Sequence, residues 1–184
     1  MQKYAFIENV PGLSKTDYHT EFNDGEWISY VIGLDGIDAC MDCAKQMIAD
    51  GCSMINLCGD FNDGHVKELM KNAPEGTEVH YAAYLPEELE KREALSEYTE
   101  YGMIIFGGVE EPKRFELLAP EMNTHTVFIK DLNQAIAVAE DFAKSGVHGI
   151  ELCSSFDGDM TRAVMEAVSS INDRIPVGSN GLTK

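Results

Sequence analysis

The sequence contains one segment twice, and this internal repeat is the feature that most constrains the fold. Residues 36–61 and 131–156 align without a gap at an offset of 95 positions. Six of the 26 aligned pairs are identical, namely Ala44/Ala139, Gly51/Gly146, Ile55/Ile150, Leu57/Leu152, Cys58/Cys153 and Phe61/Phe156. A repeat of this kind indicates a chain built from two copies of one supersecondary unit.

Each copy begins with an amphipathic helix, at 37–48 and at 132–143. Apolar residues recur there at i, i+3, i+4, i+7, i+10 and i+11, and all six positions agree in class between the copies. Gly51 and Gly146 then suit the residue just after a helix end, where a left-handed backbone is common. Each copy continues into a short strand, a polar turn and a second helix. In the first copy the strand is expected at 53–58 and the helix at 65–73, and in the second copy they are expected at 148–153 and 160–170.

The flanking segments extend this pattern to eight strands alternating with seven helices. Three further helices are expected: a short one opened by Ser14 and Asp17, the charged segment 86–99, and one near 111–119 that Pro112 would start. The expected strands are 3–8, 26–34, 53–58, 78–85, 101–107, 123–130, 148–153 and 174–179.

Alternating strands and helices predict an α/β fold with parallel pairing, so each copy is a βαβαβαβ repeat. We favour closure of the two repeats into one small eight-stranded barrel resembling a TIM barrel, because closure removes exposed sheet edges. The alternative is two packed four-stranded parallel open sheets, which the short chain of 184 residues also allows. The expected organisation is a first repeat at 1–85, a connecting helix at 86–100 and a second repeat at 101–184, all in one joint domain.

Charge narrows the classes of partner. The 14 basic and 32 acidic residues give a net charge of −18, which disfavours nucleic acid and anionic membrane surfaces as partners. No apolar run approaches the ~20 residues of a membrane span, and the first residues do not resemble a signal peptide. The expected location is therefore cytoplasmic, with the five cysteines reduced.

Several short motifs resemble an uncharacterised bacterial domain family of unknown function. The opening A-F-I at Ala5–Ile7, Pro11-Gly12 and His19 match its first part, and I-P-V-G at 175–178 matches its last strand. The central family motif I-E-L-C-G-G-F reads I-E-L-C-S-S-F at 150–156, which keeps the Glu and loses both glycines. At 55–61 it reads I-N-L-C-G-D-F, with Asn56 in place of the Glu. The chain thus resembles a tandem pair of a domain that usually occurs singly. The resemblance implies no activity.

Candidate site residues follow from the rule that ligands of parallel α/β folds bind at the carboxyl ends of strands. Strand alternation places Asn56 with Cys58, and Glu151 with Cys153, on the face turned away from the helices. A buried carboxylate there, at Glu151 or at Glu8, is a candidate general acid or base, and a hydrogen-bonded structural role is the equal alternative. The cysteines fit small buried residues better than nucleophiles. His19 enters through the family motif, and its expected place is the first loop and helix.

Two other patterns are weighed as ligand sites. Four cysteines in the pattern C-x2-C-x8-C-x5-C suggest zinc, but the second copy has Ala135 and Val138 in place of Cys40 and Cys43, so no metal site is expected. Gly178, Ser179 and Asn180 follow the last strand without an acidic residue and form a candidate anion-binding loop, or merely a chain end. No cofactor is identified.

The expected function is a small-molecule enzyme of lyase or isomerase type, or a ligand-binding site, at the carboxyl ends of the strands. The alternative is a non-catalytic binding or oligomerisation module. In that case the duplication links covalently what single-copy relatives achieve by dimerising, and a homo-oligomer is a possible partner state.

Overall fold

Each half of the chain folds into its own five-stranded sheet in the computed structural model, which describes residues 2–14, 19–23 and 25–184, with the backbone alone at 19–23. The first sheet has the order β2-β3-β1-β4-β5 and the second the order β10-β9-β6-β8-β7. The first contains β1 (Gln2–Asn9), β2 (His19–Asn23), β3 (Trp27–Leu34), β4 (Met54–Cys58) and β5 (Glu78–Tyr81). The second contains β6 (Glu100–Phe106), β7 (Lys113–Leu118), β8 (Asn123–Ile129), β9 (Gly149–Leu152) and β10 (Val177–Ser179).

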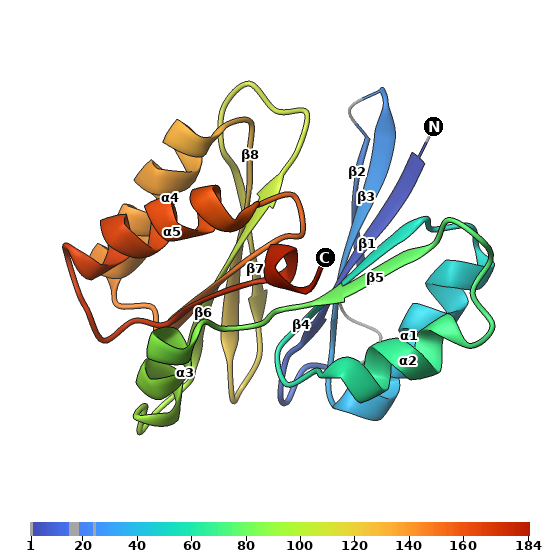
Figure 1. Ribbon diagram of the computed structural model, residues 1–184, viewed down its shortest axis with the longest axis horizontal. Coiled ribbons are helices and arrows are strands. Elements are labelled where there is room, and N and C mark those ends of the chain that lie inside the picture. The colour runs from blue at the N-terminus through green and yellow to red at the C-terminus, as the bar shows by residue number, and fades with distance from the viewer. Residues whose placement is uncertain (1, 15–18, 24) are drawn as a thin grey trace.

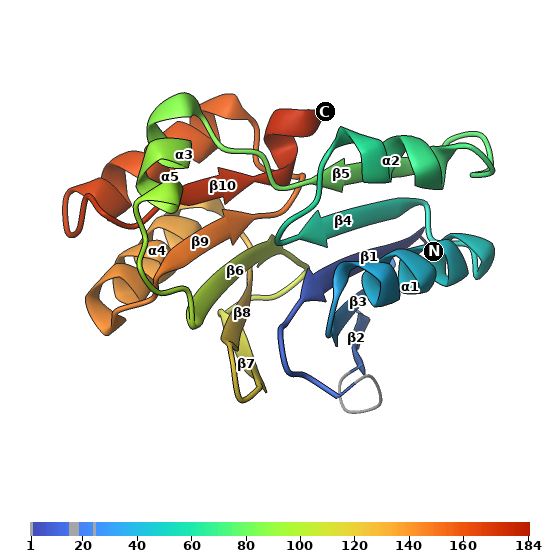
Figure 2. The same ribbon diagram turned by 90° about the horizontal axis from the view of Figure 1, so that it is seen from below.

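Helices cover the outer face of each sheet (Figures 1 and 2). Those on the first sheet are α1 (Ile37–Ala49) and α2 (Asp63–Met70), and those on the second are α4 (Leu132–Ser145) and α5 (Gly158–Ser169). The halves are connected through α3 (Pro86–Glu93), and the chain ends in a 3₁₀ turn, η1 (Asn180–Thr183). Alternate strand residues such as Ile55 and Leu57 pack under α1 and α2 in a core of the first half alone.

The inner faces of the two sheets turn toward each other and form a shared layer, here called the inter-sheet layer. Phe6 and Val31 of the first sheet belong to the same hydrophobic cluster as Met103 and Phe128 of the second. The rings of Phe6 and Phe128 meet edge to face with centroids 6.4 Å apart. The two halves therefore share one core, which also receives polar residues from both sheets.

The barrel expected from the sequence is not what the structure contains. The sheets stay separate, and their edges β5 and β10 approach only at an isolated bridge between Ala83 and Ser179. The physical reason is that β2 and β7 run antiparallel to their neighbours and cover the other two edges. The arrangement is closer to the alternative of two open sheets, with an antiparallel fifth strand added to four parallel ones in each.

Local expectations mostly agree with the structure. Each expected strand overlaps an observed one, and Gly51 and Gly146 have φ of +87° and +89° just after their helices. The helix expected near 111–119 is wrong, because β7 occupies that segment and pairs with β8. The helix expected from Ser14 falls on residues 15–18, which lie outside the described residues.

Candidate functional site

Three polar side chains that the sequence singled out are buried in the inter-sheet layer. Glu8 is at the end of β1, Asn56 is in β4 and Glu151 is in β9, and each is at most 1% exposed. Their neighbours Ile7, Ile55 and Leu57 lie on the opposite face, in the core under the helices. The alternation of the strands thus directs these polar groups away from the helices, as expected.

Glu151 accepts hydrogen bonds from three donors. The hydroxyl groups of Tyr84 and Tyr101 donate to its two oxygens at 2.6 and 2.7 Å. The backbone amide of Gly59 donates to Oε2 at 3.2 Å. Burial raises the pKa of this carboxyl group above its ordinary value, although the two tyrosine hydrogen bonds oppose the shift. Glu151 thereby connects β9 to the loop after β4 in the other half.

Glu8 has fewer partners than Glu151. Its Oε1 accepts a hydrogen bond from the Thr126 hydroxyl at 3.0 Å, whereas its buried Oε2 has no hydrogen-bond partner among the described residues. Burial raises the pKa of Glu8 to about 8; the Thr126 hydrogen bond opposes this rise and the charge of Glu151 adds to it. Glu8 is therefore mostly protonated at neutral pH and is a neutral carboxylic acid in the inter-sheet layer.

A cavity of about 230 Å³ opens beside these residues and is called the inner cavity here. Cys58, which is adjacent to Glu8 in the β1–β4 pair, lines it, and so does the Glu151 partner Tyr101. The carboxyl ends of β1 and β4 meet the amino end of β6 here, so both halves contribute to the wall. The lining residues are Asn9, Pro11, Cys58, Gly59, Asp60, Arg92, Tyr98, Tyr101 and Met122.

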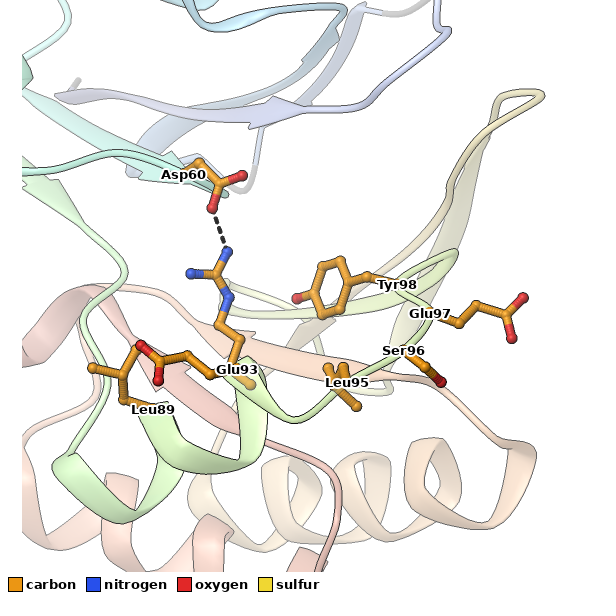
Figure 3. Close-up of a pocket in the computed structure, with 8 residues that line it drawn as sticks. Asp60, Leu89, Glu93, Leu95, Ser96, Glu97 and Tyr98 are labelled. Atoms are coloured by element: carbon orange, nitrogen blue, oxygen red, sulfur yellow. Dashed lines mark hydrogen bonds and ion pairs between the residues drawn. The ribbon is translucent and has the colours of Figure 1, made fainter.

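A wider groove of about 440 Å³ adjoins the inner cavity and shares Asp60, Arg92 and Tyr98 with it. Figure 3 shows this outer groove, with a dashed line from Asp60 to the guanidinium of Arg92, where Nη2 donates to Oδ1 at 2.6 Å. The Arg92 guanidinium also lies over the rings of Tyr84 and Tyr98, at 5.0 and 5.9 Å from their centroids. Arg92 therefore stands at the boundary between groove and cavity.

The remaining expected site residues lie elsewhere. Cys153 directly follows β9 and is fully buried, and burial raises its pKa and that of Cys58, which keeps both thiols protonated and weakly nucleophilic. His19 begins strand β2 rather than lying in a loop or helix, and its side chain is outside the described part of the chain.

The candidate anion loop is used for internal contacts. Ser179 exchanges backbone hydrogen bonds with Ala83, and its hydroxyl accepts from the amide of Gly181 at 3.1 Å. The buried Asn180 amide donates to the carbonyls of Leu57 and His80 at 3.1 and 3.3 Å. Gly178 packs directly under the ring of Tyr84. These residues hold the chain end against the first half, and Gly178 supports a partner of Glu151.

Metal and membrane signals are absent from the part of the chain that the structure describes. No group of three or more His, Cys, Asp or Glu residues there is arranged to hold a metal ion. No disulfide joins any of the five cysteines, all of which are at described positions. No described helix is long and apolar enough to cross a membrane.

Sequence reasoning missed Arg92, Tyr98 and Tyr101 as site residues. Tyr101 is at the amino end of β6, and the other two come from α3 and the segment after it. The rule that ligands bind at the carboxyl ends of strands selects residues of one sheet. It does not predict which residues of a second sheet pack against those strand ends. The available signal was a pair of basic residues, Lys91 and Arg92, and two tyrosines within the acidic segment 86–101.

The fold and the site define a duplicated α/β protein with a small cavity between its two halves. The profile of the Family of unknown function (DUF6506) matches residues 2–97 and again residues 99–182. The chain therefore belongs to this family and carries two copies of its domain in tandem, as the motif resemblance implied.

Other comparisons add little. No curated protein matches the sequence. One similar solved structure is an ABC transporter periplasmic solute binding protein from Actinobacillus succinogenes 130z with bound D-allose. The two share 10% identity, with 96% of this chain and 76% of that chain covered and a TM-score of 0.29, and a similarity of this size carries no argument.

Proposed function

We propose that the protein binds a small organic molecule in the inner cavity and that Glu8 supports acid–base chemistry on it. The observation that carries this proposal is the position of Glu8 behind the cavity wall, with a pKa of about 8 and with one carboxyl oxygen that has no hydrogen-bond partner among the described residues. A group whose pKa lies close to the working pH both donates and accepts protons efficiently. Burying a carboxyl oxygen without a hydrogen bond costs stability, and such groups occur often at functional sites.

The reaction class that fits is a lyase or isomerase acting on a carbonyl compound. Because Glu8 lies behind the cavity wall, it would exchange a proton with the ligand beside Cys58 through one water molecule. Glu151 is assigned a positioning role instead, because its three hydrogen bonds already engage the carboxylate and fix Tyr101 in the cavity wall. Asn56 supports the contact between the halves, Cys153 accepts a hydrogen bond from the amide of Phe106 within its own half, and His19 stays a prediction.

The protein as a whole would work as one joint domain in the cytoplasm. The first repeat at 1–85, the connector at 86–100 and the second repeat at 101–184 would form a single unit, because the inner cavity has walls from both repeats. The absence of disulfides among five cysteines is compatible with a reducing compartment.

A non-catalytic module is the second candidate, and one observation favours it. Glu151 and Asn56 each accept a backbone hydrogen bond from the opposite half, Glu151 from Gly59 and Asn56 from Ser154 at 2.7 Å. Both polar residues thus have a structural use that needs no substrate. In this case the cavity would serve binding alone, or the surface would serve assembly.

The test combines ligand binding with proton exchange. Small carbonyl compounds, among them pyruvate, 2-oxobutyrate, pyruvamide and dihydroxyacetone, are screened by thermal shift against the wild type and Pro11→Trp, which narrows the inner cavity. Pro112→Trp is the matched control, since Pro112 lines neither the cavity nor the groove. The proposal expects binding that Pro11→Trp abolishes and Pro112→Trp retains. Equal binding to all three proteins, or none to any, would overturn the site.

Exchange of α-protons for deuterium, followed by NMR in D₂O, separates the two candidate functions. For a bound ketone the wild type should exchange α-protons at a rate that Glu8→Gln lowers by about 10²-fold or more, with an inflection near pH 8. Glu151→Gln should weaken binding rather than remove this inflection. Binding without any catalysed exchange would support the non-catalytic module and exclude the acid–base role of Glu8.

A further inference from the structure

We propose that the ligand of the inner cavity carries a carboxylate, which takes the place of Asp60 on the guanidinium of Arg92. The inference rests on the proposed function, because it names the class of molecule that would occupy that cavity. It assigns Arg92 as the residue that anchors the ligand and Asp60 as the residue that occupies Arg92 while the cavity is empty.

Arg92 is the cation in a position to do this. It is the single basic side chain among the described residues that line the inner cavity and the outer groove. Its side chain is only 25% exposed, and its guanidinium lies over the rings of Tyr84 and Tyr98. Asp60 takes one of the five N–H donors of the guanidinium, and contact of a cation with a ring face does not require an N–H donor, so further donors are available for a planar anion.

Asp60 is a partner that a ligand can displace. Its side chain is 73% exposed, and it takes one N–H of Arg92, which offers five. Ion pairs with an exposed partner contribute little to stability, so exchanging Asp60 for another carboxylate has a small cost. A ligand carboxylate in the inner cavity is less exposed than Asp60 and accepts two parallel hydrogen bonds from the guanidinium fork.

The other lining residues fit the remainder of a short carboxylic acid. Pro11, Tyr101 and Met122 provide apolar wall, and Asn9 is a polar wall residue at the carboxyl end of β1. A volume of about 230 Å³ suits a compact metabolite rather than a drug-sized molecule. A protonated amine fits less well, because Arg92 already occupies the faces of both tyrosine rings where a cation would bind.

The net charge of −18 does not oppose this assignment. Surface carboxylates are screened over a Debye length of about 8 Å at physiological salt, whereas the half-buried guanidinium would contact the ligand directly. The acidic residues Glu93 and Glu97 line the outer groove, not the inner cavity. They would instead make anion entry slow and dependent on salt.

Three matched compounds test the class of ligand. Pyruvate carries a carboxylate, pyruvamide is its neutral analogue, and propylamine is a cation of similar size. Affinities are measured by NMR titration for the wild type, Arg92→Gln and Asp60→Asn. The expected result is pyruvate binding about tenfold or more tighter than pyruvamide, a preference that Arg92→Gln removes. Asp60→Asn should tighten pyruvate binding several-fold, because it removes the competing carboxylate.

Arg114→Gln is the matched control. Arg114 also pairs with an exposed acid, Asp141 at 2.8 Å, and also lies over an aromatic ring, Phe142 at 5.7 Å, but it lines neither cavity nor groove. Its substitution should leave both affinities unchanged. If Arg92→Gln fails to fold, Arg92→Lys serves in its place: it keeps the charge but loses the fork, so the preference for pyruvate should fall.

The outcomes separate this inference from the proposed function. Equal binding of pyruvate and pyruvamide, both lost in Pro11→Trp, would overturn the carboxylate assignment and leave the cavity as the site. Tighter binding of propylamine than of pyruvate would also overturn the carboxylate assignment, because it would show that the cavity prefers a cationic ligand. If none of these three compounds and none of the carbonyl compounds screened above binds, both proposals are overturned.

Discussion

Asn56 and Glu151 occupy the same position of the two repeats, and each accepts a hydrogen bond from the backbone amide three residues beyond the other. Asn56 Oδ1 accepts from the amide of Ser154 at 2.7 Å, and Glu151 Oε2 accepts from the amide of Gly59 at 3.2 Å. The two halves are thus related by an approximate two-fold axis, and the carboxyl end of each sheet meets the other half. This reciprocal pair is the polar joint that orients the halves.

Asn56→Ala is therefore expected to loosen this joint. The substitution removes the acceptor and leaves the buried amide of Ser154 unpaired, which should lower the free energy of unfolding by about 1–3 kcal/mol. Chemical denaturation followed by circular dichroism measures the change. Gln46→Ala is the control: it removes an exposed hydrogen bond from α1 to its C-cap residue Asp50 and should change stability by less than about 0.5 kcal/mol. Equal effects of the two substitutions would count against the joint.

Glu8 should make the protein less stable as the pH rises. Its pKa is about 8 in the folded protein against 4.5 for the free side chain, mainly because burial disfavours the charged form. Between these two values the unfolded chain has lost a proton that the folded protein keeps. The contribution of Glu8 to stability is therefore fully present below pH 4.5 and is lost as the pH rises to 8, by up to about 5 kcal/mol.

Glu8→Gln should flatten this dependence. Urea unfolding at pH 5, 6, 7 and 8 should show a smaller decline for the variant than for the wild type. Some decline should persist, because burial also raises the pKa of Glu151. Glu111→Gln, at an exposed position, should keep the wild-type slope. A Glu8→Gln slope equal to that of the wild type would show that Glu8 titrates near its ordinary pKa.

Much of the fold could be predicted from the sequence because the repeat fixes the order of the elements and strand alternation fixes which side chains face the helices. The segment 111–119 is an exception, because the helix that the sequence predicts there does not form. Pro112 and the acidic and basic residues around it favour a helix, yet β7 forms there and buries Leu117 completely. One methyl group of Leu117 occupies the space that a Cβ at Gly33 of the other half would fill, so a tertiary contact outweighs local propensity.

The sequence could predict the buried polar residues of the inter-sheet layer, but not the residues that the second half adds to the wall of the inner cavity. Glu8, Asn56 and Glu151 follow from alternation within single strands, which is visible in the sequence. Arg92, Tyr98 and Tyr101 enter because the second sheet presents its amino end, together with α3, to the carboxyl end of the first. That packing relation depends on the whole inter-sheet layer and leaves no periodic pattern in any one segment.

Gly178→Ala should disturb the site through Tyr84. A Cβ added at Gly178 would lie 2.6 Å from the Tyr84 ring, which donates its hydroxyl hydrogen bond to Glu151. The ring must move, so we expect a loss of about 1–3 kcal/mol in stability and weaker ligand binding. Gly158→Ala is the control, since a Cβ at that α5 position meets nothing within 4 Å and should be neutral or slightly stabilising. Thermal unfolding of both variants, with pyruvate titration, decides the matter.

Asn180 fastens the chain end of the second repeat to the first, and its removal should weaken the contact between the halves. Its side-chain amide donates to the carbonyls of Leu57 and His80, and all three groups are buried at the edge where β5 and β10 approach. Asn180→Ala leaves two carbonyls without this donor and should cost about 1–3 kcal/mol. Hydrogen exchange should then rise at Ala83 and Ser179, whose amides form the bridge between the sheets. Asn172→Ala, which affects only an exposed local turn, should leave those amides protected. Unchanged protection in Asn180→Ala would mean that the bridge holds the sheets together without the chain end.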